Sequence, residues 1–89
     1  MVSVKRIVLD VLKPHQPNAL EFCRTVAKVG VDYHVFLTVL DIDEKTESLQ
    51  LEITGSAIDL DDVLSSITKM GGSLHSIDEV EVQNETVTG

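Results

Sequence analysis

The fold is decided by the stretch Val4-Lys5-Arg6-Ile7-Val8-Leu9-Asp10-Val11-Leu12, which Lys13-Pro14-His15-Gln16-Pro17 cuts off. Successive side chains of an extended chain point to opposite faces. Ile7, Leu9 and Val11 therefore share one face, and Arg6, Val8 and Asp10 share the other. The pattern predicts the central strand of a small antiparallel sheet.

A helix is predicted over Asn18–Val29. Asn18 is a favourable N-cap, and Glu21 stands three residues later, as in a capping box. Apolar residues at helical spacing predict one buried stripe, which consists of Ala19, Phe22, Cys23, Val26 and Ala27. Gly30 then ends the helix. Cys23 is the one cysteine of the chain, so we expect a buried structural thiol and no internal disulfide.

Two further strands and a polar turn predict a β-hairpin. Tyr33–Asp43 is long and nearly apolar on both faces, and residues 43–47 form the polar turn. Ser48–Thr54 alternates cleanly, with its apolar side chains on the inner face: Leu49, Leu51 and Ile53.

A second helix and a last strand complete the chain. Asp59 is the expected N-cap, and the acidic residues beside it favour the positive end of the helix dipole. The buried stripe of this helix is Leu60, Val63, Leu64 and Ile67. Gly71-Gly72 ends it. Uneven apolar spacing in Ser73–Val82 predicts a bulge near Ser76–Asp78, and the polar segment Gln83–Gly89 is expected to fray.

The element order β-α-β-β-α-β predicts a ferredoxin-like α+β fold. Right-handed crossovers give a four-stranded antiparallel sheet of order 4-1-3-2 with two helices on one face. The 89 residues make one domain, residues 1–89, with an ordered core of about residues 4–82. Aromatic residues make up only 3% of the chain, so the core is expected to be aliphatic.

Charge narrows the possible partners. Residues 1–30 hold five basic and two acidic residues, whereas residues 31–89 hold two basic and thirteen acidic ones, for a net charge of −8. Nucleic acid is excluded as a partner, because its binding needs clustered Lys and Arg. The negative charge is compatible with the binding of hard cations or basic partners. Its simplest explanation is that it keeps the protein soluble. No apolar run approaches about 20 residues, so no membrane span is expected. Lys5 and Arg6 interrupt any signal-peptide core, and we expect a cytoplasmic protein.

Two stretches resemble the signatures of an archaeal family of uncharacterised proteins, domain of unknown function 211. They are Arg6-Ile7-Val8-Leu9-Asp10-Val11-Leu12-Lys13-Pro14-His15 and Gly71-Gly72-Ser73-Leu74-His75-Ser76-Ile77-Asp78-Glu79-Val80. The resemblance runs from Val4 to about Val82. It implies a ferredoxin-like fold and ring-shaped homo-oligomers. It implies no known catalytic activity and supplies no catalytic residues.

The histidines make a poor metal site. His15, His34 and His75 lack the helical or close-loop spacing of zinc ligands. Each has a simpler role, in loop hydrogen bonding, at the edge of the core or in strand pairing.

Carboxylates are better placed to hold a cation. The expected pairing sets Asp10 near Gln50 and Ser76, with Asp41 across from Gln50. Asp43 and Glu44 follow at the same edge of the sheet. Oxygen ligands suit calcium or magnesium. We therefore predict a calcium-type site at Asp10, Asp41, Asp43 and Glu44, against the alternative of solvated or cross-subunit charges. No other cofactor is expected.

Three classes of function remain. A non-enzymatic homo-oligomeric module comes first, and a small-ligand-sensing regulatory domain with its site at subunit interfaces is the alternative, from fold analogy. An enzyme comes last, because the serines lack a strained nucleophile turn and no base has a plausible spacing.

Self-association is the sharpest expectation. Tyr33–Leu40 lies at a sheet edge and contains no Asp, Glu, Lys, Arg or Pro, and soluble monomers normally protect such edges. We predict that one apolar patch is left in water and forms the interface: Tyr33, Val35, Leu37 and Val39, beside Val8. A head-to-tail contact closes a ring, which the family resemblance favours, and a self-complementary one gives a dimer.

Overall fold

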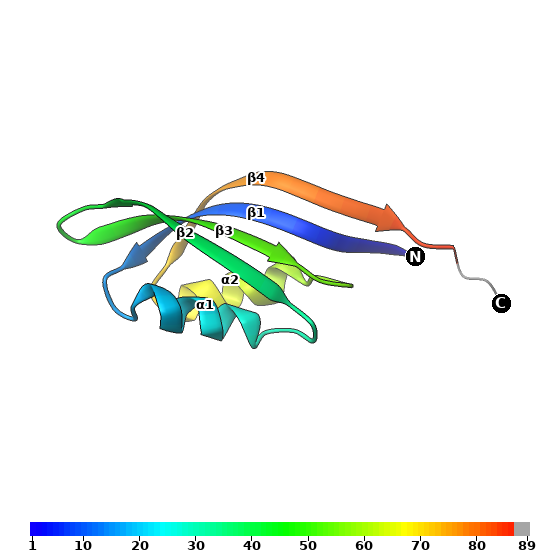
Figure 1. The fold of residues 1–89 in the computed structure, drawn as a ribbon, viewed down its shortest axis with the longest axis horizontal. Helices are drawn as coiled ribbons and strands as arrows, with labels where there is room; N and C mark the ends of the chain where they lie inside the picture. The colour runs from blue at the N-terminus through cyan, green and yellow to red at the C-terminus, as the bar shows by residue number, and fades with distance from the viewer. Residues whose placement is uncertain (87–89) are drawn as a thin grey trace.

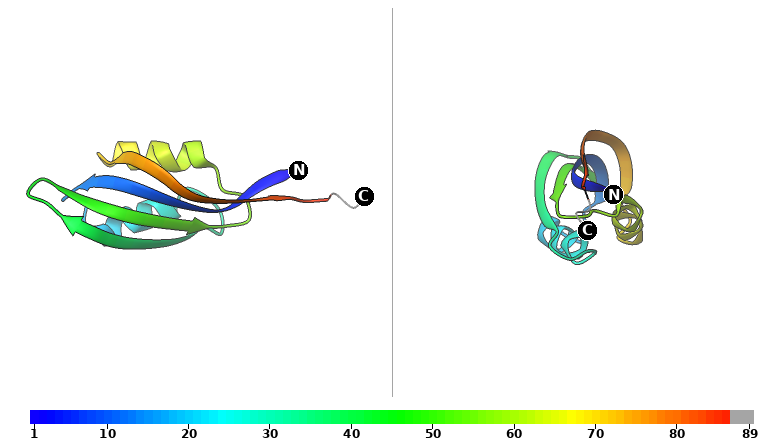
Figure 2. Two further views of the ribbon diagram at one scale, coloured as in Figure 1. Left: turned by 90° about the horizontal axis from the view of Figure 1, so that it is seen from above. Right: turned by 90° about the vertical axis from the view of Figure 1, so that its right-hand side faces the viewer.

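The computed structural model describes residues 1–86, which form a four-stranded antiparallel sheet with two helices on one face (Figures 1 and 2). The elements are β1 (Val2–Pro14), α1 (Ala19–Ala27), β2 (His34–Ile42), β3 (Thr46–Thr54), α2 (Leu60–Lys69) and β4 (Ser73–Asn84). The strand order is β2-β3-β1-β4, which is the predicted order read from the other edge. The ferredoxin-like α+β fold is therefore confirmed.

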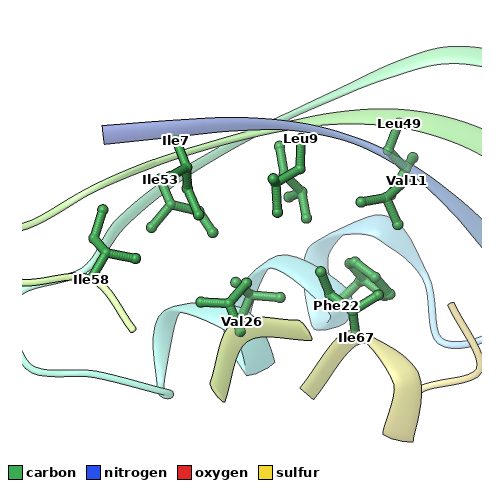
Figure 3. Packing of buried hydrophobic residues seen from close by; sticks show 11 residues of the cluster. Ile7, Leu9, Val11, Phe22, Val26, Leu49, Ile53, Ile58 and Ile67 are labelled. Carbon is green, nitrogen blue, oxygen red and sulfur yellow. The ribbon is translucent and has the colours of Figure 1, made fainter. Parts of the chain in front are cut away.

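Strand β1 is central and longer than predicted. Its odd-numbered apolar residues face the helices, because Ile7 lies opposite Ile53 and Leu9 opposite Leu51 in an uninterrupted register with β3. Facing side chains from both helices complete the core (Figure 3). The core residues are Ile7, Leu9, Val11, Phe22, Val26, Leu49, Leu51, Ile53, Ile58, Val63 and Ile67. Phe22 is their one aromatic member, so the core is aliphatic as expected.

Both helices begin where their caps predict. The Asn18 side chain accepts a hydrogen bond from the Glu21 N–H, and the Asp59 side chain accepts one from the Asp62 N–H. Helix α1 ends at Ala27, two residues before the predicted end. Cys23 is only half-buried, with its sulfur 3.6 Å from the Val35 carbonyl oxygen, and burial raises the pKa of its thiol.

Strand β4 is irregular where a bulge was predicted. Its register passes from Glu79 to Ile77, which leaves Asp78 out of step, and from Ser76 to Leu74, which leaves His75 out of step. The predicted bulge near Ser76–Asp78 is confirmed. Residues 83 and 84, which we expected to fray, continue the strand; residues 87–89 lie outside the described part.

The two ends of the sheet extend beyond the helices. Strands β1 and β4 run together toward the termini at one end, and the β2–β3 turn reaches out at the other (Figure 1). The described molecule is accordingly long, with extents of 54 × 22 × 17 Å. Neither of the two helices found in residues 1–86 has the length and apolar character needed to cross a membrane.

Candidate self-association edge

Strand β2 is the outermost strand on one side of the sheet, paired with β3. Its residues from His34 to Leu40 carry no formal charge, and we call their outward side the bare edge. Large apolar side chains along β2 reach water: Phe36 is 60% exposed, Leu40 57% and Ile42 65%. An uncharged, apolar edge strand is the kind of edge that pairs with another strand.

The register of β2 corrects the predicted patch. Val35 lies opposite Ile53 and Leu37 opposite Leu51, so both side chains point toward the helices. Tyr33, Val35 and Leu37 pack against the core, half-buried.

The other two members of that patch also separate. Val39 lies opposite the core residue Leu49, on the helix side, while Val8 is 2% exposed on the other face. The expectation that all five residues share one water-facing surface is therefore wrong. The strand is apolar on both sides, so its sequence alone left the facing side undetermined.

We call the sheet face opposite the helices the open face; unlike the helix side, it carries charged residues. Phe36, Glu52, Val8 and Glu79 lie in one row across its four strands. Arg6 bridges the two carboxylates, with nitrogen–oxygen distances of 2.6 Å to Glu52 and 2.9 Å to Glu79. These hydrogen bonds, first to Glu79 and then to Glu52, raise the pKa of Arg6. Phe36 is thus the large apolar side chain that ends this row at the bare edge.

A bulge marks the far end of the bare edge. The register between β2 and β3 shifts between Val39 and Asp41, which leaves Leu40 out of step. The regular part of β2 therefore runs from His34 to Val39. A bulge twists an edge away and discourages further pairing.

The opposite edge strand, β4, is protected. It carries Asp78, Glu79 and Glu81, and its ladder with β1 shifts register three times over its twelve residues. It also exposes Ile77 (46%) and Val80 (62%), but these lie opposite Leu9 and Ile7 and so on the helix side. Charge and bulges are the usual protection of an edge strand.

The carboxylates predicted to hold calcium lie apart along the sheet. Asp10 lies opposite Gln50 and Ser76, as expected, but Asp41 lies opposite Ser48, and Thr38 takes the place opposite Gln50. The Asp43 N–H closes the β2–β3 turn by donating to the Thr46 carbonyl. Within residues 1–86, no three His, Cys, Asp or Glu side chains gather closely enough to hold a metal ion. The calcium site stays a prediction that this arrangement does not support.

A buried lysine lies near the same turn, and the sequence pattern did not predict it. Lys13 is 0% exposed, and its Nζ donates to the carbonyls of Pro14 at 2.8 Å and Pro17 at 2.7 Å. The Nζ also lies 3.1 Å from a Glu47 carboxylate oxygen. Lys13 continues the helix-facing row of β1, with Glu47 directly opposite. Extending the alternation past Leu12 could have found this pair.

His15 ties the same loop to the β2–β3 turn. Its Nδ1 lies 3.0 Å from Glu47, and its Nε2 lies 2.9 Å from the Glu44 carbonyl oxygen. Both partners accept hydrogen bonds, so the protonated ring satisfies both at once. These contacts, first with Glu47, raise the pKa of His15, and in return the His15 and Lys13 hydrogen bonds lower the pKa of Glu47. The other histidines, His34 and His75, are exposed on the two edge strands.

Two comparisons with known proteins point to the same family. The family model of domain of unknown function 211, described as uncharacterized ArCR, matches residues 5–89. The uncharacterized protein MJ0319 of Methanocaldococcus jannaschii is 39% identical over 80 residues, which cover 90% of this chain and 82% of that protein. The family that the sequence signatures suggested is thereby confirmed. The chain belongs to the archaeal DUF211 family.

Proposed function

We propose that this protein is a homo-oligomeric module without catalytic activity of its own, and that the bare edge of β2 is its assembly surface. One observation carries the proposal: a regular, uncharged edge strand, His34–Val39, presents Phe36 with 60% of its surface in water. An edge left this way in a soluble chain invites pairing with another strand. Fully burying a side chain such as Phe36 contributes about 1.5–3 kcal/mol before the costs of association.

The contacts of Lys13 and His15 support the non-catalytic part of the proposal. Lys13 is engaged by loop carbonyls and Glu47, and His15 links Glu47 to the β2–β3 turn. These contacts join loops to strands, which is a structural role. A closed ring, which the family resemblance favours, is the form of assembly that we propose.

Light scattering on the wild type and two lysine variants tests this function. Phe36→Lys places a charge on the bare edge, whereas Leu20→Lys changes an equally exposed residue (59%) on α1. We expect an oligomer for the wild type and for Leu20→Lys, and a monomer for Phe36→Lys at micromolar concentration. A monomeric wild type contradicts the proposal. Leu37 is unsuited to this test, because its side chain packs against the core.

Ligand sensing is the second candidate, and one observation favours it. A shallow groove of about 520 Å³ lies between the start of β1 and the start of α2, lined by Met1–Val4 and residues 57–61. Its volume is within the usual range for small-molecule sites, about 300–1,000 Å³. A thermal-shift screen tests this candidate, since a specific ligand at 100 times its Kd adds about 2.7 kcal/mol to stability. A screen of amino acids and nucleotides without any shift argues against it.

A further inference from the structure

We propose that the groove between the start of β1 and the start of α2 binds a primary alkylammonium ion, a compound with a short aliphatic chain and one protonated amine. The aliphatic chain lies on the apolar lining of the groove, and the ammonium meets the carboxylates of Asp59 and Asp61. This inference rests on the second candidate function, ligand sensing at the same groove, because it names the chemical class of the ligand.

The groove lies where the sheet narrows. Strand β3 pairs with β1 only from Arg6 onward, whereas β4 accompanies β1 from Val2. The segment between β3 and α2 crosses beside β1, and its Ile58 N–H donates to the Val4 carbonyl at 2.9 Å. Before that bond, β1 has a strand on one side only, and the groove of about 520 Å³ lies beside it.

The lining of the groove suits an aliphatic chain. Ile58 is 6% exposed and belongs to the core, so it forms a fixed part of the wall, whereas Val2 is 65% exposed and can be covered. None of the lining residues is aromatic, so the groove offers no ring on which a nucleobase could stack. The apolar lining consists of Met1, Val2, Val4, Ala57, Ile58 and Leu60.

Two carboxylates stand on the α2 side of the groove. Asp59 caps α2 with one oxygen, which accepts from the Asp62 N–H at 3.1 Å, and its other oxygen accepts no hydrogen bond within residues 1–86. Asp61 is exposed and forms no ion pair in the same part of the chain. An alkylamine is protonated at pH 7, as a lysine side chain is. Carboxylates beside an apolar wall therefore match a ligand with an ammonium at one end.

Ser3 supplies an observation that is independent of the charge. It lines the groove and is only 7% exposed, yet its hydroxyl has no hydrogen-bond partner within residues 1–86. Buried hydroxyls are normally hydrogen-bonded. No side-chain oxygen of the described residues is both sealed from solvent and unpartnered, so this hydroxyl stays accessible. An ammonium carries three N–H donors, one of which can serve the Ser3 oxygen.

Other classes of ligand fit the groove less well. Phosphates and carboxylates are repelled by Asp59 and Asp61. The next basic residue along β1 is already engaged, because the Lys5 Nζ donates to the Ser56 carbonyl at 2.7 Å and pairs with Glu85. A bare metal ion needs several oxygen ligands, and no three His, Cys, Asp or Glu side chains gather to hold one in residues 1–86.

An NMR titration with three probes of equal chain length tests this chemistry. Hexylamine, 1-hexanol and hexanoate are added separately at the same ionic strength, and the methyl resonances of Val2, Val4 and Leu60 are followed. We expect saturable shifts with hexylamine and affinities about fivefold lower, or less, for the neutral and anionic probes. If 1-hexanol or hexanoate binds as tightly as hexylamine, the ammonium is overturned and the groove remains a ligand site.

A matched pair of variants tests the role of the carboxylate. Asp61→Asn should lower the affinity for hexylamine to that for 1-hexanol. Asp62→Asn removes the same charge one residue along α2, outside the groove lining, and should leave the affinity unchanged. Equal losses in both variants mean attraction by net charge alone and overturn the inference. Absence of shifts with all three probes also overturns it, whereas ligand sensing itself falls only if the thermal-shift screen is empty as well.

Discussion

The two edge strands of this sheet differ in how they are protected against pairing with another strand. The ladder that β4 forms with β1 shifts register three times and β4 carries three carboxylates, whereas β2 is regular and uncharged from His34 to Val39. Both strands belong to one small domain with one core, so the demands of folding do not account for the difference. The contrast between an unprotected edge and a protected one supports our proposal that β2 is an assembly surface.

The inner sides of the two edges also differ. Leu37 and Ile77 end the same row across the sheet, through Leu51 and Leu9, but Leu37 packs against the core and Ile77 is 46% exposed. Helix α1 contacts β2, and α2 contacts β4. Strand β2 is thus held from its inner side while its outer edge is free for pairing.

The largest effect is expected on that inner side. Leu37→Lys forces a charge toward the core and should lower the free energy of unfolding by about 2 kcal/mol or more. Ile77→Lys, at the other end of the row, keeps its ammonium in water and should cost less than about 1 kcal/mol. Urea unfolding of both variants measures the difference. If both variants lower the free energy of unfolding equally, Leu37 does not point toward the core.

The next largest effect is expected when the charges that protect the β4 edge are removed. Replacing Asp78 and Glu81 together by Val removes two charges from that edge, and we expect assemblies larger than those of the wild type. Asp61→Val with Asp62→Val removes the same charge from α2 and serves as the control. Light scattering at matched concentration distinguishes them. If both double variants behave alike, total charge and not the edge controls association.

A smaller effect concerns the turn at the end of β2. The pKa of His15 is raised in the folded protein, so its contribution to stability is complete below pH 6.5, its ordinary value, and is lost as pH rises through the folded pKa. The pKa of Glu47 is lowered, so its contribution is lost as pH falls through its folded pKa. The two together stabilise the turn between these limits.

The difference in melting temperature between wild type and His15→Gln measures this contribution. We expect it to be largest near pH 6 and to shrink toward pH 9. An NMR titration should show His15 titrating above 6.5. If the difference in melting temperature does not depend on pH, a charged contact between His15 and Glu47 does not stabilise the protein.

The smallest effect is expected for calcium. In the Phe36→Lys variant, which we expect to be monomeric, millimolar CaCl₂ should leave the melting temperature unchanged, because Asp10 and Asp41 lie on strands separated by β3. A rise of several degrees in the melting temperature with CaCl₂ would support the calcium site predicted from the sequence. Magnesium chloride at the same ionic strength is the control for screening.

The sequence predicts the topology well and the edges poorly. Alternation at Ile7, Leu9 and Val11 fixes one buried face of β1, and the caps Asn18 and Asp59 fix both helix starts. Strand β2 is apolar on both sides, so either face satisfied the pattern, and its register depended on the turn and the bulge at Leu40.

The buried Lys13 escaped prediction for a related reason. A proline directly after it was read as the end of the strand, although β1 runs through Pro14. A lysine at the end of a strand usually points to water. Its burial depends on loop carbonyls and Glu47, which no local pattern brings together.

Hydrogen exchange along the two edges tests the central claim most directly. Amides that point outward from β2 between His34 and Val39 should exchange slowly, and faster on dilution, because a partner strand covers them. Outward amides of β4 should exchange quickly at every concentration. Rapid exchange along both edges, independent of concentration, would contradict the account and leave β2 an ordinary exposed edge.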